Sequence, residues 1–190
     1  MSRIAIITGS TRPGRRSPSV AQWVLEQADG RVDATFTIVD LADFDLPHLN
    51  EPVPAAMGPN YVHAGTRTWS DTIASFDGFV FVTPEYNHSM PGVLKDAVDY
   101  LYDEWSNKAA GFVSYGIDGG VRAVEQMRLV MAEVGIADVR HQVALSLFHD
   151  FSGEVPQPND HAIATLSVML DEVVAWSLAL APLRSVEVPA

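Results

Sequence analysis

The sequence predicts a doubly wound α/β fold, in which helices cover both faces of a parallel β-sheet. Five short segments, at residues 4–8, 33–40, 78–83, 110–115 and 137–145, are rich in apolar and β-branched residues. The segments at 4–7 and 79–82 show no alternation with polar residues, which is typical of strands buried on both faces. Segments with helical spacing of apolar residues separate these strands, and this order favours a parallel sheet.

The first half of the chain contains two predicted strands, each followed by a loop. The strand at 4–8 is followed by a glycine-containing loop and then by a helix from residue 17 to just before Gly30, because Pro18 suits a first helical turn and Val20, Trp23 and Val24 have helical spacing. The strand at 33–40 leads into residues 41–65, where four prolines and two glycines predict a long loop, with one short turn of helix within it as the alternative. A helix at 68–76 then precedes the third strand.

The second half continues the same alternation. After the strand at 78–83 and a polar loop, Pro91 suits a first helical turn, and apolar residues recur at steps of three or four as far as Trp105, which predicts a helix that includes Trp105. The strand at 110–115, a helix at 121–134 that ends at Gly135, and the strand at 137–145 follow. A final helix at 158–180 is expected to bury a stripe of residues that runs from Ile163 to Trp176.

Length and composition exclude several classes of protein. The 190 residues are expected to form a single domain that spans residues 1–190. Twelve basic and 24 acidic residues give a net charge of −12, which repels phosphate backbones and anionic membranes, so no nucleic-acid partner is expected. The absence of cysteine excludes disulfides, thiolate zinc sites and a cysteine nucleophile. The six histidines lack the paired spacing of metal ligands, so no metal site is expected.

The most apolar stretch, residues 162–181, approaches the length of a membrane span. It carries Asp171 and Glu172 at its middle, where each charge costs about 2.5 to 3.5 kcal/mol in a membrane. We therefore expect no membrane helix and a cytoplasmic protein.

The loop after the first strand concentrates positive charge. Arg12, Arg15 and Arg16 lie within five residues of one another, at the start of the predicted helix. Free backbone N–H groups, hydroxyls and arginines at a helix N-terminus favour a bound phosphate. The nucleoside-triphosphate motif does not fit, because Arg15 and Arg16 stand where that motif needs Lys and Ser/Thr. The dinucleotide motif does not fit either, because Thr11 stands where that motif needs its second glycine. A single terminal phosphate fits better, and the alternative interpretation is a solvated basic loop.

Two further loops follow the third and fourth strands. Residues 83–92 combine Tyr86 with the polar side chains of Asn87, His88 and Ser89, which suits a flat heteroaromatic ligand. The alternative is a proline-stiffened turn. Residues 114–122 contain three glycines, which permit a ligand to approach the backbone closely, although an ordinary glycine-rich connection has the same composition. All three loops are expected at the carboxyl edge of the sheet, where ligands bind in such folds.

With these three loops in this order, the sequence resembles the NADPH-dependent FMN reductase family, which includes quinone and azo-dye reductases. The matching segments are residues 9–15 (GSTRPGR), 83–89 (TPEYNHS), 94–99 (LKDAVD) with 101–102 (LY), 114–116 (SYG) and 119–123 (GGVRA). The resemblance runs from residue 3 to about residue 143. It implies a flavodoxin-like sheet in the order 2-1-3-4-5 and a bound FMN. It also implies that a hydride passes from NADPH or NADH through FMN to a flavin, quinone or azo acceptor.

The resemblance also implies which residues form the site. The residues implied to contact the phosphate or the ring of FMN are Ser10, Thr11, Arg12, Arg15, Arg16, Ser17, Pro84, Glu85, Tyr86, Asn87, Ser114, Tyr115, Gly116 and Gly119. No acid–base residue is obligatory, because the flavin carries the hydride chemistry. Tyr86 and His88 are the candidate proton donors to an acceptor.

A homodimer or a dimer of dimers is expected from the same resemblance. A non-catalytic flavodoxin-type FMN electron carrier is the main alternative function, because it would share the fold and the acidic charge. A sensor domain that binds a phosphate ligand without redox chemistry is the third.

Overall fold

The computed structural model describes residues 1–184 and contains a five-stranded parallel sheet. Its strands lie in the order β2-β1-β3-β4-β5, which confirms the predicted fold class and strand order. The strands are β1 (Ser2–Thr8), β2 (Ala34–Asp40), β3 (Gly78–Pro84), β4 (Ala109–Gly116) and β5 (Ala137–Ser146). Residues 4–8 of β1 and every residue of β3 are buried, which explains why the segments at 4–7 and 79–82 show no alternation of apolar and polar residues.

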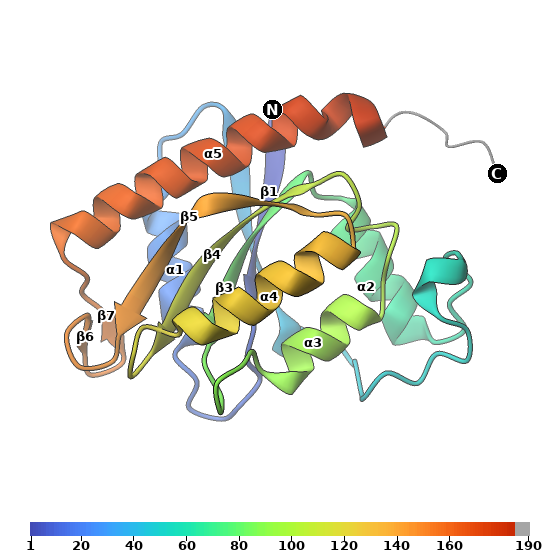
Figure 1. The fold of residues 1–190 in the computed structure, drawn as a ribbon, viewed down its shortest axis with the longest axis horizontal. Coiled ribbons are helices and arrows are strands. Elements are labelled where there is room, and N and C mark those ends of the chain that lie inside the picture. Colours follow the sequence, from blue (N-terminus) through green and yellow to red (C-terminus); the bar gives the residue numbers. More distant parts are fainter. Residues whose placement is uncertain (185–190) are drawn as a thin grey trace.

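Helices cover both faces of the sheet (Figure 1). The helices are α1 (Ser17–Gln27), α2 (Ala64–Ala74), α3 (Gly92–Asp99), α4 (Val121–Glu133) and α5 (Asp160–Arg184). Side chains of β1 point alternately to the two sides: Ile4 and Ile6 join the apolar cluster under α1 and α5, whereas Ala5 and Ile7 join the cluster under α2, α3 and α4. The sheet is therefore the middle layer of three, and its carboxyl edge is left to the loops.

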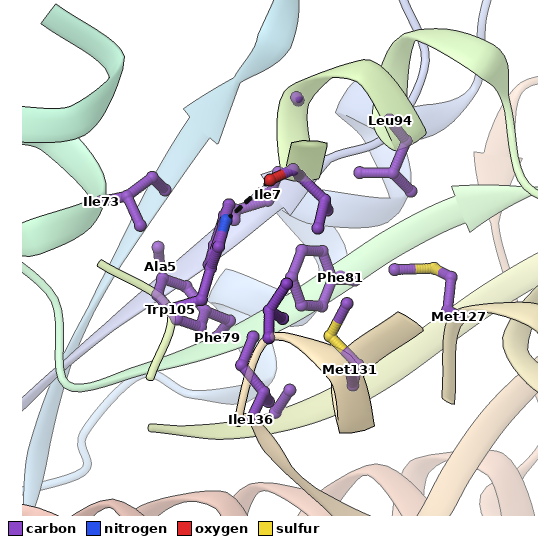
Figure 2. Packing of buried hydrophobic residues seen from close by; sticks show 14 of the residues in the cluster. Ala5, Ile7, Ile73, Phe79, Phe81, Leu94, Trp105, Met127, Met131 and Ile136 are labelled. Atoms are coloured by element: carbon purple, nitrogen blue, oxygen red, sulfur yellow. Dashed lines mark hydrogen bonds between the residues drawn. The ribbon is translucent and has the colours of Figure 1, made fainter. Parts of the chain in front are cut away.

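Trp105 lies in the core, although it does not belong to a helix. Helix α3 ends at Asp99, so the predicted helix through Trp105 is wrong. The chain turns after Asp99, and the indole ring still packs against Phe79 and Phe81, with centroid distances of 5.0 and 6.1 Å (Figure 2). Its N–H donates to the carbonyl of Val98 at 3.0 Å. The apolar spacing thus predicted the burial of Trp105 correctly and the length of α3 incorrectly.

The long segment after β2 contains more regular structure than the sequence predicts. Two short 3₁₀ helices, Leu41–Asp43 and Ala55–Met57, lie within it. Helix α2 begins at Ala64, before the predicted start at residue 68. Glu51 accepts hydrogen bonds from the N–H groups of Val62 and His63, at 2.9 and 3.1 Å, and so fastens the end of the loop to its middle.

The C-terminal third differs from the prediction in two ways. A hairpin of two-residue strands, β6 (Phe151–Ser152) and β7 (Val155–Pro156), precedes α5, and strands this short carry no periodic signal. Helix α5 buries Leu166 and Val173, but Ile163 and Trp176 are 36% and 45% exposed, so the predicted stripe is wrong at both ends. By length and composition alone α5 also qualifies as a membrane span, and its inner face packs on β4 and β5.

Candidate functional site

Three loops meet at the carboxyl edge of the sheet. We call residues 9–17, after β1, the phosphate loop; residues 83–92, at the end of β3, the ring loop; and residues 114–122, at the end of β4, the glycine loop. A cavity of about 210 Å³ opens between them, lined by Arg12, Arg15, Arg16, Pro84, Glu85, Tyr86, Tyr115, Gly116, Ile117 and Leu147. The first eight of these residues belong to the predicted site, whereas Ile117 and Leu147 do not.

The phosphate loop presents unpaired hydrogen-bond donors. Within residues 1–184, the backbone N–H groups of Ser10, Thr11, Arg16 and Ser17 have no acceptor, and no side chain caps the N-terminus of α1. The Nε atoms of Arg15 and Arg16 are buried and also have no partner. A helix N-terminus with free N–H groups and two arginines is suited to an anion. The site therefore carries positive charge where the sequence predicted a phosphate.

Two pairs of hydroxyl groups connect the phosphate loop to the other loops. The hydroxyls of Ser10 and Tyr86 lie 2.8 Å apart, and those of Ser17 and Tyr115 lie 2.7 Å apart. Burial raises the pKa of Tyr115 to about 12, although its hydrogen bond with Ser17 acts in the opposite direction. Tyr115 therefore stays protonated at neutral pH. The serines predicted to hold a phosphate are thus placed by tyrosines from the ring and glycine loops.

The three arginines of the phosphate loop have different partners. Arg15 forms an ion pair with Asp40 at 2.6 Å. Arg16 donates to the carbonyl of Gly153 at 3.2 Å and lies over the ring of Phe151, whereas Arg12 is exposed and lies 6.0 Å from the Tyr86 ring centroid. Asp40 and the β6–β7 hairpin are parts of the site that the sequence did not predict. The sequence did contain one indication that Asp40 lies at the site, which is its position at the end of the predicted second strand.

The ring loop has a tight turn at its tip. Tyr86 and Ser89 exchange two backbone hydrogen bonds, at 2.9 and 3.2 Å, across Asn87 and His88, which have φ values of 49° and 73°. Positive φ at both central residues is the geometry of a two-residue hairpin turn, and asparagine tolerates it better than most side chains do. Asn87 and His88 are exposed at this tip and do not line the cavity, whereas Tyr86 does.

Glu85 connects the ring loop to helix α4. Its carboxylate accepts from the Arg122 guanidinium at 2.8 Å and from the Arg122 N–H at 3.1 Å, so it supplies the N-terminal cap that α4 otherwise lacks. Ser114 donates from its hydroxyl to the carbonyl of Gly119 at 2.7 Å and is buried beneath the glycine loop. These two predicted ligands therefore hold loops together with their side chains. Thr11 lines a neighbouring cavity of about 360 Å³ with residues of the segment after β2.

We expect Glu85→Ala to lower the free energy of unfolding by about 1 to 2 kcal/mol, because it removes two charged hydrogen bonds from a side chain that is 12% exposed. Asp118→Ala is the matched control. Asp118 binds the same Arg122 at 3.0 Å but is 60% exposed, and such pairs contribute about 0 to 1 kcal/mol. Urea denaturation measures both variants, and equal losses would contradict the capping role of Glu85.

Comparison with known proteins identifies the family of the chain. Residues 2–150 match the family model described as NADPH-dependent FMN reductase. The chain belongs to this family. An NAD(P)H-dependent FMN reductase of Schizosaccharomyces pombe is 38% identical over 149 residues, which cover 78% of this chain and 74% of that protein. A quinone reductase of Pseudomonas putida is 32% identical over 188 residues, which cover 91% of this chain and 93% of that protein.

A solved structure shows the same fold. The flavoenzyme FerB of Paracoccus denitrificans, an NAD(P)H:(acceptor) oxidoreductase, superposes with a TM-score of 0.72 at 22% sequence identity, over 94% of this chain and 98% of that one. With the family established, this chain is an FMN-dependent NAD(P)H oxidoreductase, and the electron carrier is not favoured. The predicted cofactor, FMN, and the predicted donor, NAD(P)H, are confirmed by the same family match.

The residues of this reductase fit FMN. The buried, unpartnered Nε atoms of Arg15 and Arg16 and the free N–H groups at the start of α1 match the needs of the terminal phosphate. The cavity lined by these arginines is also lined by two aromatic residues, Tyr86 and Tyr115, which suit the flat ring of the cofactor. In the described part of the chain, no three His, Cys, Asp or Glu side chains are grouped so that they could hold a metal ion.

Proposed function

We propose that this reductase holds FMN across the phosphate, ring and glycine loops and reduces small quinones with NADPH or NADH. The observation that carries the proposal is a single cavity whose lining combines two kinds of group. Arg15 and Arg16 supply unpaired hydrogen-bond donors for a phosphate, and Tyr86, Tyr115 and Gly116 supply aromatic side chains and a glycine backbone for the ring. FMN, when bound, supplies the hydride chemistry by accepting from the nicotinamide and giving to the acceptor. The similarity to a quinone reductase favours quinones, and azo compounds and free flavin are the alternative acceptors.

In this proposal the protein binds and orients FMN and supplies a proton to the acceptor. Arg15, Arg16 and the N-terminus of α1 bind the phosphate, while the backbone of Pro84, Tyr86 and Gly116 borders the ring. The Tyr86 hydroxyl, hydrogen-bonded to Ser10, is the proton donor to the reduced acceptor, because it lines the cavity. His88 is a weaker candidate, since it lies on the exposed tip of the ring loop.

The assembly and location of the enzyme are part of the same proposal. Residues 1–190 act as a single FMN-binding domain, of which 185–190 lie outside the described residues. The chain forms a homodimer or a dimer of dimers in the cytoplasm. Family membership supports the assembly, and the absence of cysteine and the acidic composition support the location.

An anaerobic titration of the FMN-loaded protein with NADPH, and separately with NADH, tests the proposal. We expect stoichiometric loss of the visible flavin absorption with at least one donor. Addition of a small benzoquinone should restore the absorption, more rapidly than an azo dye or free FMN does. Flavin that stays oxidised with both donors would support the electron carrier instead. A protein that does not bind FMN would overturn the assignment of all three loops.

A further inference from the structure

Asp40 lies against the phosphate loop and has no part in the proposed chemistry. It is the last residue of β2, and its carboxylate Oδ2 pairs with Nη2 of Arg15 at 2.6 Å. Both side chains are about one fifth exposed, at 20% and 19%. An ion pair that is this close and this shielded from solvent restricts the arginine much more than a surface pair does.

The carboxylate of Asp40 is itself held in place. Its Oδ1 atom accepts from the Thr8 hydroxyl at 2.7 Å and from the Ala42 N–H at 3.0 Å. Burial alone would raise the pKa of Asp40, but the hydrogen bonds from Thr8, Ala42 and Arg15 outweigh burial and lower it. The group is thus a fixed anion, anchored to the ends of β1 and β2, on which the Arg15 side chain rests.

The remaining donors of Arg15 are still free for a ligand. The guanidinium carries five N–H groups, and Asp40 engages only Nη2, whereas Nε is buried without a partner. A phosphate at the start of α1 can therefore bind Arg15 without displacing Asp40. Fixing the side chain before the ligand arrives also reduces the entropy lost on binding.

We infer that Asp40 is a positioning residue, which holds the Arg15 guanidinium with its free N–H groups toward the phosphate of FMN. The inference rests on the proposed function, because it needs FMN to bind at the phosphate loop. Asp40 does not touch the cofactor in this arrangement. Its effect reaches the cofactor only through Arg15.

The test compares FMN with riboflavin, which has the same ring and no phosphate. For Asp40→Asn we expect FMN to bind about tenfold more weakly, as for the loss of one charged contact, with riboflavin affinity unchanged. Asp43→Asn, the same substitution at an exposed position of the adjoining 3₁₀ helix, is the control and should change neither affinity. Fluorescence titration of the apo protein measures all of these dissociation constants.

A double-mutant cycle separates positioning from a general structural effect. In an Arg15→Ala background, Asp40→Asn should weaken FMN by less than about twofold, because the residue through which Asp40 acts is gone. Equal losses for FMN and riboflavin, or an undiminished loss in the Arg15→Ala background, would overturn the inference. Tighter FMN binding by Asp40→Asn would also overturn it, since Asp40 would then compete with the phosphate.

Failure of the proposed function and failure of the variant to fold can both be distinguished from failure of the inference about Asp40. If the wild-type protein does not bind FMN, the proposed function fails rather than the role of Asp40. If Asp40→Asn does not fold, Asp40→Glu retains the charge and displaces it by one methylene. We expect this variant to weaken FMN severalfold and to leave riboflavin unchanged, and unchanged FMN affinity in it would count against the inference.

Discussion

Gly120→Ala is expected to lower the free energy of unfolding by about 3 to 4 kcal/mol and to weaken FMN binding at least tenfold. Gly120 has a φ of 73°, which strains an alanine. A Cβ atom there would also lie 2.9 Å from both the N and the O atoms of Tyr115. Because both neighbours are backbone of β4, neither can rotate away. The glycine loop must shift instead, and with it the edge of the cavity formed by Gly116.

Gly30→Ala isolates the cost of the backbone conformation. Gly30 has a φ of 77°, and a Cβ atom there would meet nothing within 4 Å. This control should lose only about 1 kcal/mol of stability and keep its FMN affinity. Urea denaturation and fluorescence titration measure the two effects. If the two variants lose equal stability, steric contact with Tyr115 is not what requires a glycine at position 120.

The fold could be predicted from the sequence where burial alone determines the structure. Residues 4–7 of β1 and all of β3 are buried, so their unbroken apolar residues predicted both the strands and the layers around them. The same spacing predicted the burial of Trp105 but not the end of α3 at Asp99, because helix length depends on local turns that apolar spacing does not report. The β6–β7 hairpin is too short to produce a periodic pattern.

The site could be predicted as a set of loops but not as a set of contacts. Parallel strands end at one edge, so the positions of three loops followed from the strand order. The partners of individual side chains depend on residues far away in the sequence. Arg15 meets Asp40 from the next strand, Glu85 meets Arg122 from α4, and Ser17 meets Tyr115 from β4. Residue type predicted which side chains bear charge, and only the folded chain determines which of those charges remain free.

Arg15→Ala is expected to weaken FMN binding by ten- to a hundredfold, as for the loss of about 1.5 to 3 kcal/mol from a charged hydrogen bond to phosphate. The buried Nε of Arg15 has no partner in the protein, so its substitution removes a donor that only a ligand satisfies. Riboflavin, which lacks the phosphate, should bind the variant as it binds the wild-type protein. Fluorescence titration with both flavins makes the comparison.

Arg140→Ala is the matched control for the loss of one positive charge. Arg140 is exposed on β5, and two strands separate β5 from β1, which leads into the phosphate loop. Both variants lose one positive charge, so the net charge of the protein changes equally. Beyond the roughly 8 Å screening length at physiological salt, a general field effect is small, and Arg140→Ala should leave the FMN affinity unchanged. Equal losses in both variants would mean that net charge, not contact with the phosphate, governs binding. Loss of riboflavin affinity in Arg15→Ala would mean that Arg15 supports the shape of the loop instead.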